Sequence, residues 1–448
     1  MDVNNFLFYR IFCIFAHQKD RSAMTFNIIT LGCPKNVVDS EVIAAQLQKQ
    51  GHQVIYESPG KSDVVIINTC GFIGDAREES VNEILEQVVR KKRRLVKKIF
   101  VVGCLVKRFK PDLLESVPEV DGYYDFAELS ELLRSEDFQL LRSTDRLLST
   151  PHHYAYLKIS EGCDHQCSYC SIPLIRGKQV SKPIPMLVEE MEKLAAQGVK
   201  EVMLIAQDLT YYGVDLTGKQ ELAALMEALA QVKGIEWIRL HYTYPLNFPV
   251  EILDVMNKYP QYCRYLDIPV QHISDDILKS MRRGGSSRYI HQLIETIREK
   301  VPGIALRTTL ITGYPGETHE QHQELLDFIR KAQFERLGAF TYSQEEHTPA
   351  YDLGDPIKKS VKTKRYNDIM RLQEEISLAF NEEKVDQTLK VMVDAEEEDY
   401  YVGRTEFDSP DVDNLVFITK EQPLVIGEFY PVRITEAAPY DLFGTVEA

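Results

Sequence analysis

The chain has 448 residues, of which 44% are hydrophobic and 27% charged, and its formal net charge is −16 at pH 7. This length predicts two to four domains with ample cores, and the negative charge disfavours sequence-independent binding to a polyanion. Eight cysteines in so long a chain do not make a disulfide scaffold, and their clustering indicates metal ligation in a reducing, cytoplasmic compartment.

Residues 1–23 do not match the pattern of a folded domain. The apolar stretch from Phe6 to Ala16 contains Arg10, is too short to span a bilayer and lacks a small-residue cleavage site. We therefore predict a disordered extension, or a start of translation at Met24. No other segment is long and apolar enough to cross a membrane, so we expect no membrane partner.

Short apolar strand patterns alternate with helical patterns from Met24 to about residue 145. The strands are predicted over 26–31, 63–68 and 99–102, and the helices over 39–50 and 77–92. This alternation predicts an open parallel α/β sheet as the first domain, residues 24–150.

One cysteine directly follows each of these three strands, namely Cys33, Cys70 and Cys104. Because the carboxyl ends of parallel strands meet at one edge of a sheet, we expect these cysteines to converge although they are far apart in the chain. Three unrelated core cysteines are the alternative. The repeated position at a strand end favours a metal cluster bound by three cysteines.

Cys163, Cys167 and Cys170 form a C-x3-C-x2-C motif, with Tyr169 just before the last cysteine. Three thiolates on one loop can bind three irons of a cubane cluster. No fourth cysteine follows nearby, which leaves one iron open for chemistry. Structural zinc with His165 as the fourth ligand is an alternative. Zinc sites, however, usually combine two separated cysteine pairs, and this chain shows none.

The central part of the sequence contains six strand–helix units. Strands are predicted over 156–160, 201–206, 236–240, 265–270, 305–312 and 337–342, and helices over 185–197, 220–232, 249–259, 288–300 and 318–332. Six units predict a partial, open (β/α)6 barrel, which together with a linking helix forms a domain of residues 151–383. Functional groups in barrels collect at the carboxyl ends of the strands, where Gln207, Asp208 and Gly313 are found.

The hydrophobic period changes to two after Thr388. Five short strands are predicted over 389–393, 400–405, 414–417, 429–434 and 442–446, which indicates a small closed antiparallel β-barrel of residues 384–448. This segment has five basic and fifteen acidic side chains, hence a net charge of −10. Such a surface repels a polyanion and attracts a basic protein.

The loop from Cys163 to Cys170 resembles the signature of the radical S-adenosylmethionine enzymes. The resemblance implies that Cys163, Cys167 and Cys170 hold a [4Fe–4S] cluster whose open iron binds S-adenosyl-L-methionine and cleaves it to a radical. It also implies a set of residues that hold S-adenosylmethionine: Tyr169, Gln207, Asp208, Arg307 and Gly313.

With its second cysteine triad, the chain over residues 24–448 is similar to the methylthiotransferases within that superfamily. This implies a second [4Fe–4S] cluster on Cys33, Cys70 and Cys104 that carries the sulfur to be transferred. It further implies a carboxyl-terminal TRAM domain, a reductant such as flavodoxin or ferredoxin, and a sulfur donor.

The segments Leu31–Asn36 and Asp39–Glu41 most resemble the branch that modifies the β-carbon of an aspartate in small-subunit ribosomal protein number twelve. The tRNA-modifying branch typically has Gln-Met-Asn where this chain has Pro34-Lys35-Asn36. Two alternatives stay open at this point. One is a tRNA-adenosine methylthiotransferase, and the other is a non-catalytic iron–sulfur or zinc binding module on the ribosome.

Overall fold

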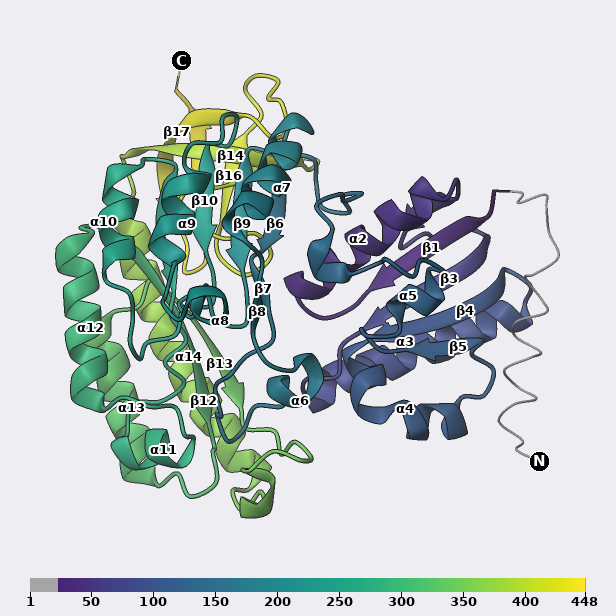
Figure 1. Cartoon of the computed structure of the whole chain (residues 1–448). Helices are drawn as coiled ribbons and strands as arrows, with labels where there is room; N and C mark the ends of the chain where they lie inside the picture. The colour runs from purple at the N-terminus through teal and green to yellow at the C-terminus, as the bar shows by residue number, and fades with distance from the viewer. Residues whose placement is uncertain (1–22, 448) are drawn as a thin grey trace.

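The computed structural model describes residues 23–447, and the expectations for residues 1–22 lie outside this range. Figure 1 shows three parts: an amino-terminal sheet in purple and blue, a central sheet in teal and green, and a carboxyl-terminal barrel in yellow. Over the described residues, none of the helices combines the length and the apolar composition that crossing a bilayer requires.

The amino-terminal sheet is parallel throughout, with the strand order β2-β1-β3-β4-β5. The strands are β1 (Thr25–Thr30), β2 (Gln53–Tyr56), β3 (Ser62–Thr69), β4 (Val96–Gly103) and β5 (Gly122–Tyr124), and the helices are α2 (Pro34–Lys49), α3 (Gly74–Lys92), α4 (Cys104–Ser116) and the short α5 (Leu129–Leu132) and η1 (Leu140–Arg142). The run Val64–Ile67 in β3 is buried on both faces, as expected of a strand between two helix layers.

The central sheet has six parallel strands in the order β13-β12-β11-β10-β9-β6 and does not close. The strands are β6 (Tyr154–Lys158), β9 (Glu201–Ile205), β10 (Trp237–Leu240), β11 (Tyr262–Asp267), β12 (Ala305–Thr312) and β13 (Arg336–Thr341). The principal helices are α7 (Ile184–Ala196), α9 (Leu222–Leu229), α10 (Glu251–Lys258), α12 (Ser287–Lys300) and α13 (His319–Ala332), followed by α14 (Lys359–Glu382). The predicted partial barrel is therefore confirmed.

Short elements complete the loops of the central sheet. They are β7 (Ser160–Glu161) paired with β8 (Val180–Ser181), α6 (Ile172–Arg176), α8 (Val214–Thr217), α11 (Asp275–Ser280) and η2 (Tyr351–Leu353). The fourth strand of the sheet begins three residues earlier than the sequence predicts, because Tyr262 and Cys263 are also buried in it.

The carboxyl-terminal strands β14 (Thr388–Glu396), β15 (Tyr400–Arg404), β16 (Leu415–Thr419), β17 (Phe429–Ala437) and β18 (Asp441–Val446) form a closed barrel. All five predicted strands are present, and four of the five pairings are antiparallel. The pairing of β16 with β18 is parallel, which differs from the expected all-antiparallel barrel. Val391, Val416 and Val432 lie in the barrel core.

Candidate functional site

Cys33, Cys70 and Cys104 lie at the carboxyl ends of β1, β3 and β4, which are neighbouring strands. Gly32 is so close to Cys70 that a Cβ at Gly32 would lie 2.7 Å from the Cys70 Cβ and 3.0 Å from its Sγ. A Cβ at Gly71 would lie 2.8 Å from the carbonyl carbon of Cys104. The three strand ends therefore meet at one edge of the sheet, as the sequence predicts.

The backbone around this triad is fixed by side-chain amides. Asn36 donates hydrogen bonds to the carbonyls of Leu31 (2.7 Å) and Thr69 (3.2 Å), so it ties the end of β1 to the end of β3. The N–H of Cys70 donates to Ser80 Oγ at 3.0 Å. Since these groups are buried, the loops that hold the three thiols are held in place independently of any ligand.

Burial dominates the chemistry of these thiols. It raises the pKa of Cys70 to about 12 and also raises the pKa of Cys104. Without a bound cation such thiols stay protonated, whereas coordination to iron stabilises the thiolate form. Three sulfur donors at one sheet edge fit an iron–sulfur cluster, whose iron would hold them as thiolates.

The loop with the second cysteine triad precedes α6 and lies at the carboxyl edge of the central sheet. The N–H of Cys163 donates to the carbonyl of Gly177 at 3.1 Å, and the N–H of Ser168 donates to the carbonyl of Met281 at 2.8 Å. The carbonyl of Ser168 accepts from the N–H of Ala350 at 2.8 Å. These three bonds attach the loop to distant parts of the half-barrel.

Two thiols of this loop share the environment of the first triad. Burial raises the pKa of Cys163 and of Cys170 to about 12. Arg283 donates from Nη1 to Cys167 Sγ at 3.7 Å, and its guanidinium lies 4.2 Å from the centroid of the Tyr244 ring. This loop, too, offers three sulfur donors with a cation beside them.

The ring of His165 contacts residues outside this loop. Its Nε2 lies 2.7 Å from Asp208 Oδ2, and its ring stacks on Tyr244 at 3.9 Å between centroids. Within residues 23–447, no group of three or more His, Cys, Asp or Glu side chains is placed to hold a single metal ion. A zinc ion needs its donors around one point, whereas iron and sulfide hold the cysteines of a cluster further apart. His165, the fourth ligand in the zinc alternative, is paired with Asp208 instead.

Three of the residues predicted to hold S-adenosylmethionine lie at strand ends. Gln207 follows β9 and donates from Nε2 to Glu161 at 3.1 Å, while its buried Oε1 has no partner. Asp208 Oδ1 accepts from the N–H of Thr210 at 2.7 Å. The N–H of Gly313, which follows β12, donates to Glu317. Gln207 thus keeps one acceptor free for a ligand.

The other two predicted residues are Tyr169, in the cysteine loop, and Arg307, within a strand. Tyr169 packs against a buried cluster that contains Tyr314 and Tyr342. Arg307 lies within β12, and its guanidinium is 3.2 Å from Asp413 of the carboxyl-terminal barrel. The roles of all five residues in holding S-adenosylmethionine stay predictions.

A buried group of charges between the two triads was not predicted from the sequence. Lys158 of β6 and Arg176 of α6 form ion pairs with Asp39 of α2 and Glu161 of β7. Burial alone would raise the pKa of Glu161, but Arg176 and Lys158 outweigh it and hold that pKa at about 2. Asp39 belongs to the quoted Asp39–Glu41 segment, but no motif indicates that it pairs with Arg176, which follows it by 137 residues.

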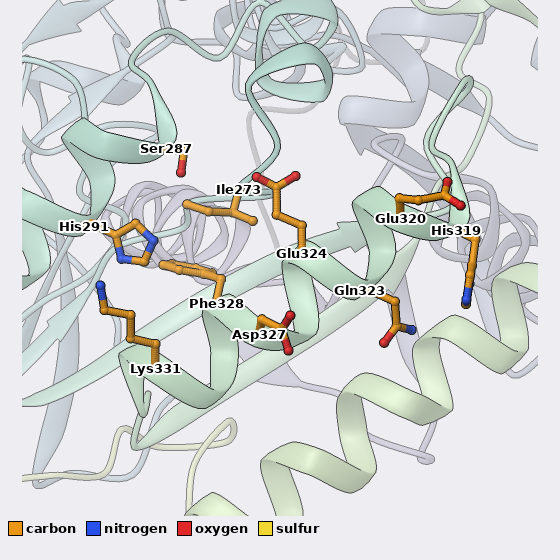
Figure 2. A pocket seen from close by; sticks show the side chains of 10 residues that line it. All are labelled: Ile273, Ser287, His291, His319, Glu320, Gln323, Glu324, Asp327, Phe328 and Lys331. Carbon is orange, nitrogen blue, oxygen red and sulfur yellow. The ribbon is translucent and has the colours of Figure 1, made fainter.

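A pocket of about 540 Å³ lies between α12 and α13, on the outside of the half-barrel. Figure 2 shows its lining, with Lys331 reaching toward His291 below Ser287, and His319 at the opposite end beyond Glu324. None of the residues that line it is a predicted site residue. The predicted cysteines lie instead at the carboxyl edges of the two sheets.

Three family models match the chain: the radical SAM superfamily over residues 157–329, uncharacterized protein family UPF0004 over residues 25–125, and the TRAM domain over residues 385–446. A relative from Christiangramia forsetii is 52% identical over 421 residues, which are 93% of this chain and 93% of the relative. A relative from Flavobacterium johnsoniae is 52% identical over 93% of this chain and 97% of the relative. Both bear the name ribosomal protein uS12 methylthiotransferase RimO.

The chain belongs to the RimO family of methylthiotransferases. Membership of the radical SAM superfamily implies a [4Fe–4S] cluster and S-adenosylmethionine, and the sulfur donors of the Cys163–Cys170 loop fit such a cluster.

RimO family members share their fold with more distant radical enzymes. The solved structure of the methyltransferase TsrM from Kitasatospora setae matches this chain with a TM-score of 0.55 and 16% sequence identity, over 73% of this chain and 77% of TsrM. A second structure of TsrM, with tryptophan and a S-adenosylmethionine analogue bound, matches with a TM-score of 0.56 and 14% identity, over 84% of this chain and 79% of TsrM. At such identity the likeness concerns the fold alone.

Proposed function

We propose that this protein is a methylthiotransferase that adds a methylthio group to the β-carbon of an aspartate in ribosomal protein uS12. The observation that carries the proposal is the pair of cysteine triads at facing sheet edges, joined through one buried side chain: Arg176 follows Cys170 by six residues and donates to Cys104 Sγ at 3.4 Å. The names of relatives with 52% identity supply the substrate. These relatives are not named for tRNA, which makes the tRNA-adenosine activity the weaker candidate.

The two triads have different roles in this proposal. Cys163, Cys167 and Cys170 hold the radical-generating [4Fe–4S] cluster, and Cys33, Cys70 and Cys104 hold an auxiliary [4Fe–4S] cluster. When bound, these clusters and S-adenosylmethionine supply the radical, the sulfur and the methyl group.

The chain itself binds and orients these groups. The free Oε1 of Gln207 would accept a hydrogen bond from a ribose hydroxyl of S-adenosylmethionine, and Asp208 pairs with His165 of the Cys163–Cys170 loop. The backbone at Gly313 and the ring of Tyr169 complete the cofactor pocket. Arg307 is assigned to the carboxylate of S-adenosylmethionine, an assignment that requires it to exchange Asp413 for the ligand.

We further propose domain boundaries at residues 24–150, 151–383 and 384–448. The proposed reaction needs an electron from a protein such as flavodoxin or ferredoxin, and a separate sulfur donor. We propose a cytoplasmic location, because the assigned substrate is a ribosomal protein.

The experiment that tests this proposal is intact-protein mass spectrometry of small-subunit ribosomal proteins from cells with and without the gene. We expect uS12 to carry one methylthio group only when the gene is present. Complementation with Cys163→Ala should abolish both 5′-deoxyadenosine formation and the product. Cys70→Ala should keep cleavage of S-adenosylmethionine but lose sulfur insertion.

Cys263→Ala is the matched control, because Cys263 lies in β11 and packs against Trp237 and Met392, away from both triads. It should leave the methylthio group on uS12. An unmodified uS12 together with gene-dependent methylthio-adenosine in tRNA would refute the assigned substrate. Sulfur insertion by Cys70→Ala would refute the auxiliary cluster.

A further inference from the structure

Arg176 is the last residue of α6 and one of the most deeply buried cations between the two cysteine triads. Its side chain is only 2% exposed. Nη1 donates to Asp39 Oδ2 at 2.7 Å and to Glu161 Oε2 at 3.0 Å. Nη2 donates to Asn36 Oδ1 at 2.6 Å and to Cys104 Sγ at 3.4 Å.

The charged side chains around Arg176 sum to zero net charge, without any contribution from the Cys104 thiol. Asp39 and Glu161 neutralise Lys158 and Arg176, so the two carboxylates have no excess charge to offer. The remaining edge of the guanidinium points at Cys104, and its charge also acts on the thiols of Cys33 and Cys70. The guanidinium carbon lies over the Phe126 ring, 3.7 Å from the ring centroid. This arrangement suits a guanidinium that stabilises a thiolate.

The same residue connects elements of both sheets. Asn36 and Asp39 lie on α2 and Cys104 begins α4, whereas Glu161 lies on β7 and Arg176 closes the segment that begins with the Cys163–Cys170 loop. Glu161 in turn accepts from Gln207, a predicted S-adenosylmethionine contact, at 3.1 Å. The Arg176 guanidinium therefore connects the amino-terminal sheet with the segment that carries the Cys163–Cys170 loop.

We propose that Arg176 is a positioning residue whose hydrogen bond to Cys104 raises the reduction potential of the auxiliary cluster and fixes the two triads relative to each other. The inference rests on the proposed function, because it requires the auxiliary cluster. Hydrogen bonds and positive charge next to ligand sulfurs stabilise the more negative, reduced state of a cluster. A bidentate guanidinium performs both tasks, which a lysine ammonium cannot reproduce in full.

The test uses the full chain with Cys163, Cys167 and Cys170 all replaced by Ala, so that only the auxiliary cluster is present. In this parent we would measure iron content and the midpoint potential of the cluster by electron paramagnetic resonance, then repeat both measurements with Arg176→Gln and Arg176→Lys. We expect Arg176→Gln to shift the potential to a more negative value, and Arg176→Lys to give a smaller shift in the same direction.

Arg146→Gln is the matched control. Arg146 is equally buried, at 1% exposure, and forms ion pairs with Glu41 and Glu190, but its hydrogen bonds reach no cysteine. We expect it to reduce stability and leave the potential unchanged. In the otherwise unchanged enzyme, Arg176→Gln should lower the ratio of methylthio product to 5′-deoxyadenosine by about tenfold or more, as is typical for a lost partner of a metal ligand.

An unshifted potential in Arg176→Gln with iron retained would overturn the inference alone. Loss of iron in Arg176→Gln, with retention in Arg176→Lys and Arg146→Gln, would support the need for a cation at this thiolate. Equal loss of iron in all three variants would mean that Arg176 contributes only to the packing of the protein, and it would overturn the inference. A parent that binds no iron would instead overturn the auxiliary cluster of the proposed function, and the inference with it.

Discussion

At the scale of single residues, Gly32 controls the place of Cys70. Gly32 has a φ of +93°, a backbone conformation that costs an L-residue roughly 1–3 kcal/mol. Its missing side chain is also needed, since a Cβ would lie 2.7 Å from the Cys70 Cβ. Gly32→Ala therefore combines backbone strain with displacement of a proposed cluster ligand. Gly51 has a similar φ of +84° but no atom within 4 Å of its hypothetical Cβ, so Gly51→Ala carries the strain alone.

We expect Gly32→Ala to lose more stability than Gly51→Ala, and only Gly32→Ala to lose iron from the auxiliary site. The measurement is iron per chain after anaerobic reconstitution, combined with urea unfolding of each variant. Full iron content in Gly32→Ala would show that Cys70 can shift without consequence for the cluster.

The cysteines could be predicted from sequence because a strand end is a local feature, and parallel strands bring their ends together. Arg176 and the ion pair of Arg307 with Asp413 show which parts of the site could not be predicted. Arg176 makes its contacts to Asn36 and Cys104, which precede it by 140 and 72 residues. Arg307 lies against Asp413, which follows it by 106 residues. Such pairs depend on how separate domains pack, and nothing in the local pattern carries that information.

At the scale of elements, the segment between β15 and β16 attaches the small barrel to the half-barrel. Asp408 accepts from Arg336 of β13 at 2.6 Å, and Asp413 lies 3.2 Å from Arg307 of β12. The acidic charge of the carboxyl-terminal domain is therefore partly used inside the molecule. The exposed run Glu396–Asp399 remains available to a basic partner, so the total of fifteen acidic residues overstates the attraction.

We expect Asp408→Ala to destabilise the protein by about 3–5 kcal/mol, because it leaves Arg336 buried without its carboxylate. Asp399→Ala changes an exposed carboxylate of the same domain and should change the free energy of unfolding by less than about 0.5 kcal/mol. Urea unfolding followed by circular dichroism measures both. Equal, small effects would mean that Arg336 finds another partner or water.

The two strands of the amino-terminal sheet that the sequence analysis did not predict are both short edge strands. β2 has four residues and β5 has three, at the two edges of the amino-terminal sheet, and their side chains are mostly half-buried. Neither strand contains the apolar run that marked Val64–Ile67. The five strands of the small barrel were predictable from their period of two, but the parallel pairing of β16 with β18 was not, because pairing partners are set by the closed barrel.

At the scale of the whole molecule, the amino-terminal sheet domain and the carboxyl-terminal barrel both pack against the six-stranded central sheet. Val38 of α2 packs with Tyr154 and Tyr156 of β6. At the other side, Met392 of the small barrel packs against Trp237 and against strand β11. The guanidinium of Arg239, which is fully buried, donates to the carbonyl of Glu406 at 2.6 Å. The small barrel therefore completes the core of the half-barrel, in addition to any contact that it makes with a substrate.

This arrangement makes a prediction about a chain that ends at Glu383. The shortened protein keeps all six proposed cluster cysteines, yet it exposes Trp237 and leaves Arg239 and Arg336 without the acceptors that the small barrel supplies. Unpaired cations and apolar surface on the inner face destabilise the sheet that carries the Cys163–Cys170 loop. We expect a lower melting temperature, aggregation, and loss of 5′-deoxyadenosine formation, whereas the full chain with Glu396–Asp399 replaced by Ala should keep all three properties of the unchanged enzyme. A shortened protein that stays monomeric, binds iron and cleaves S-adenosylmethionine at the full-length rate would show that the small barrel is an independent module attached to a self-sufficient half-barrel.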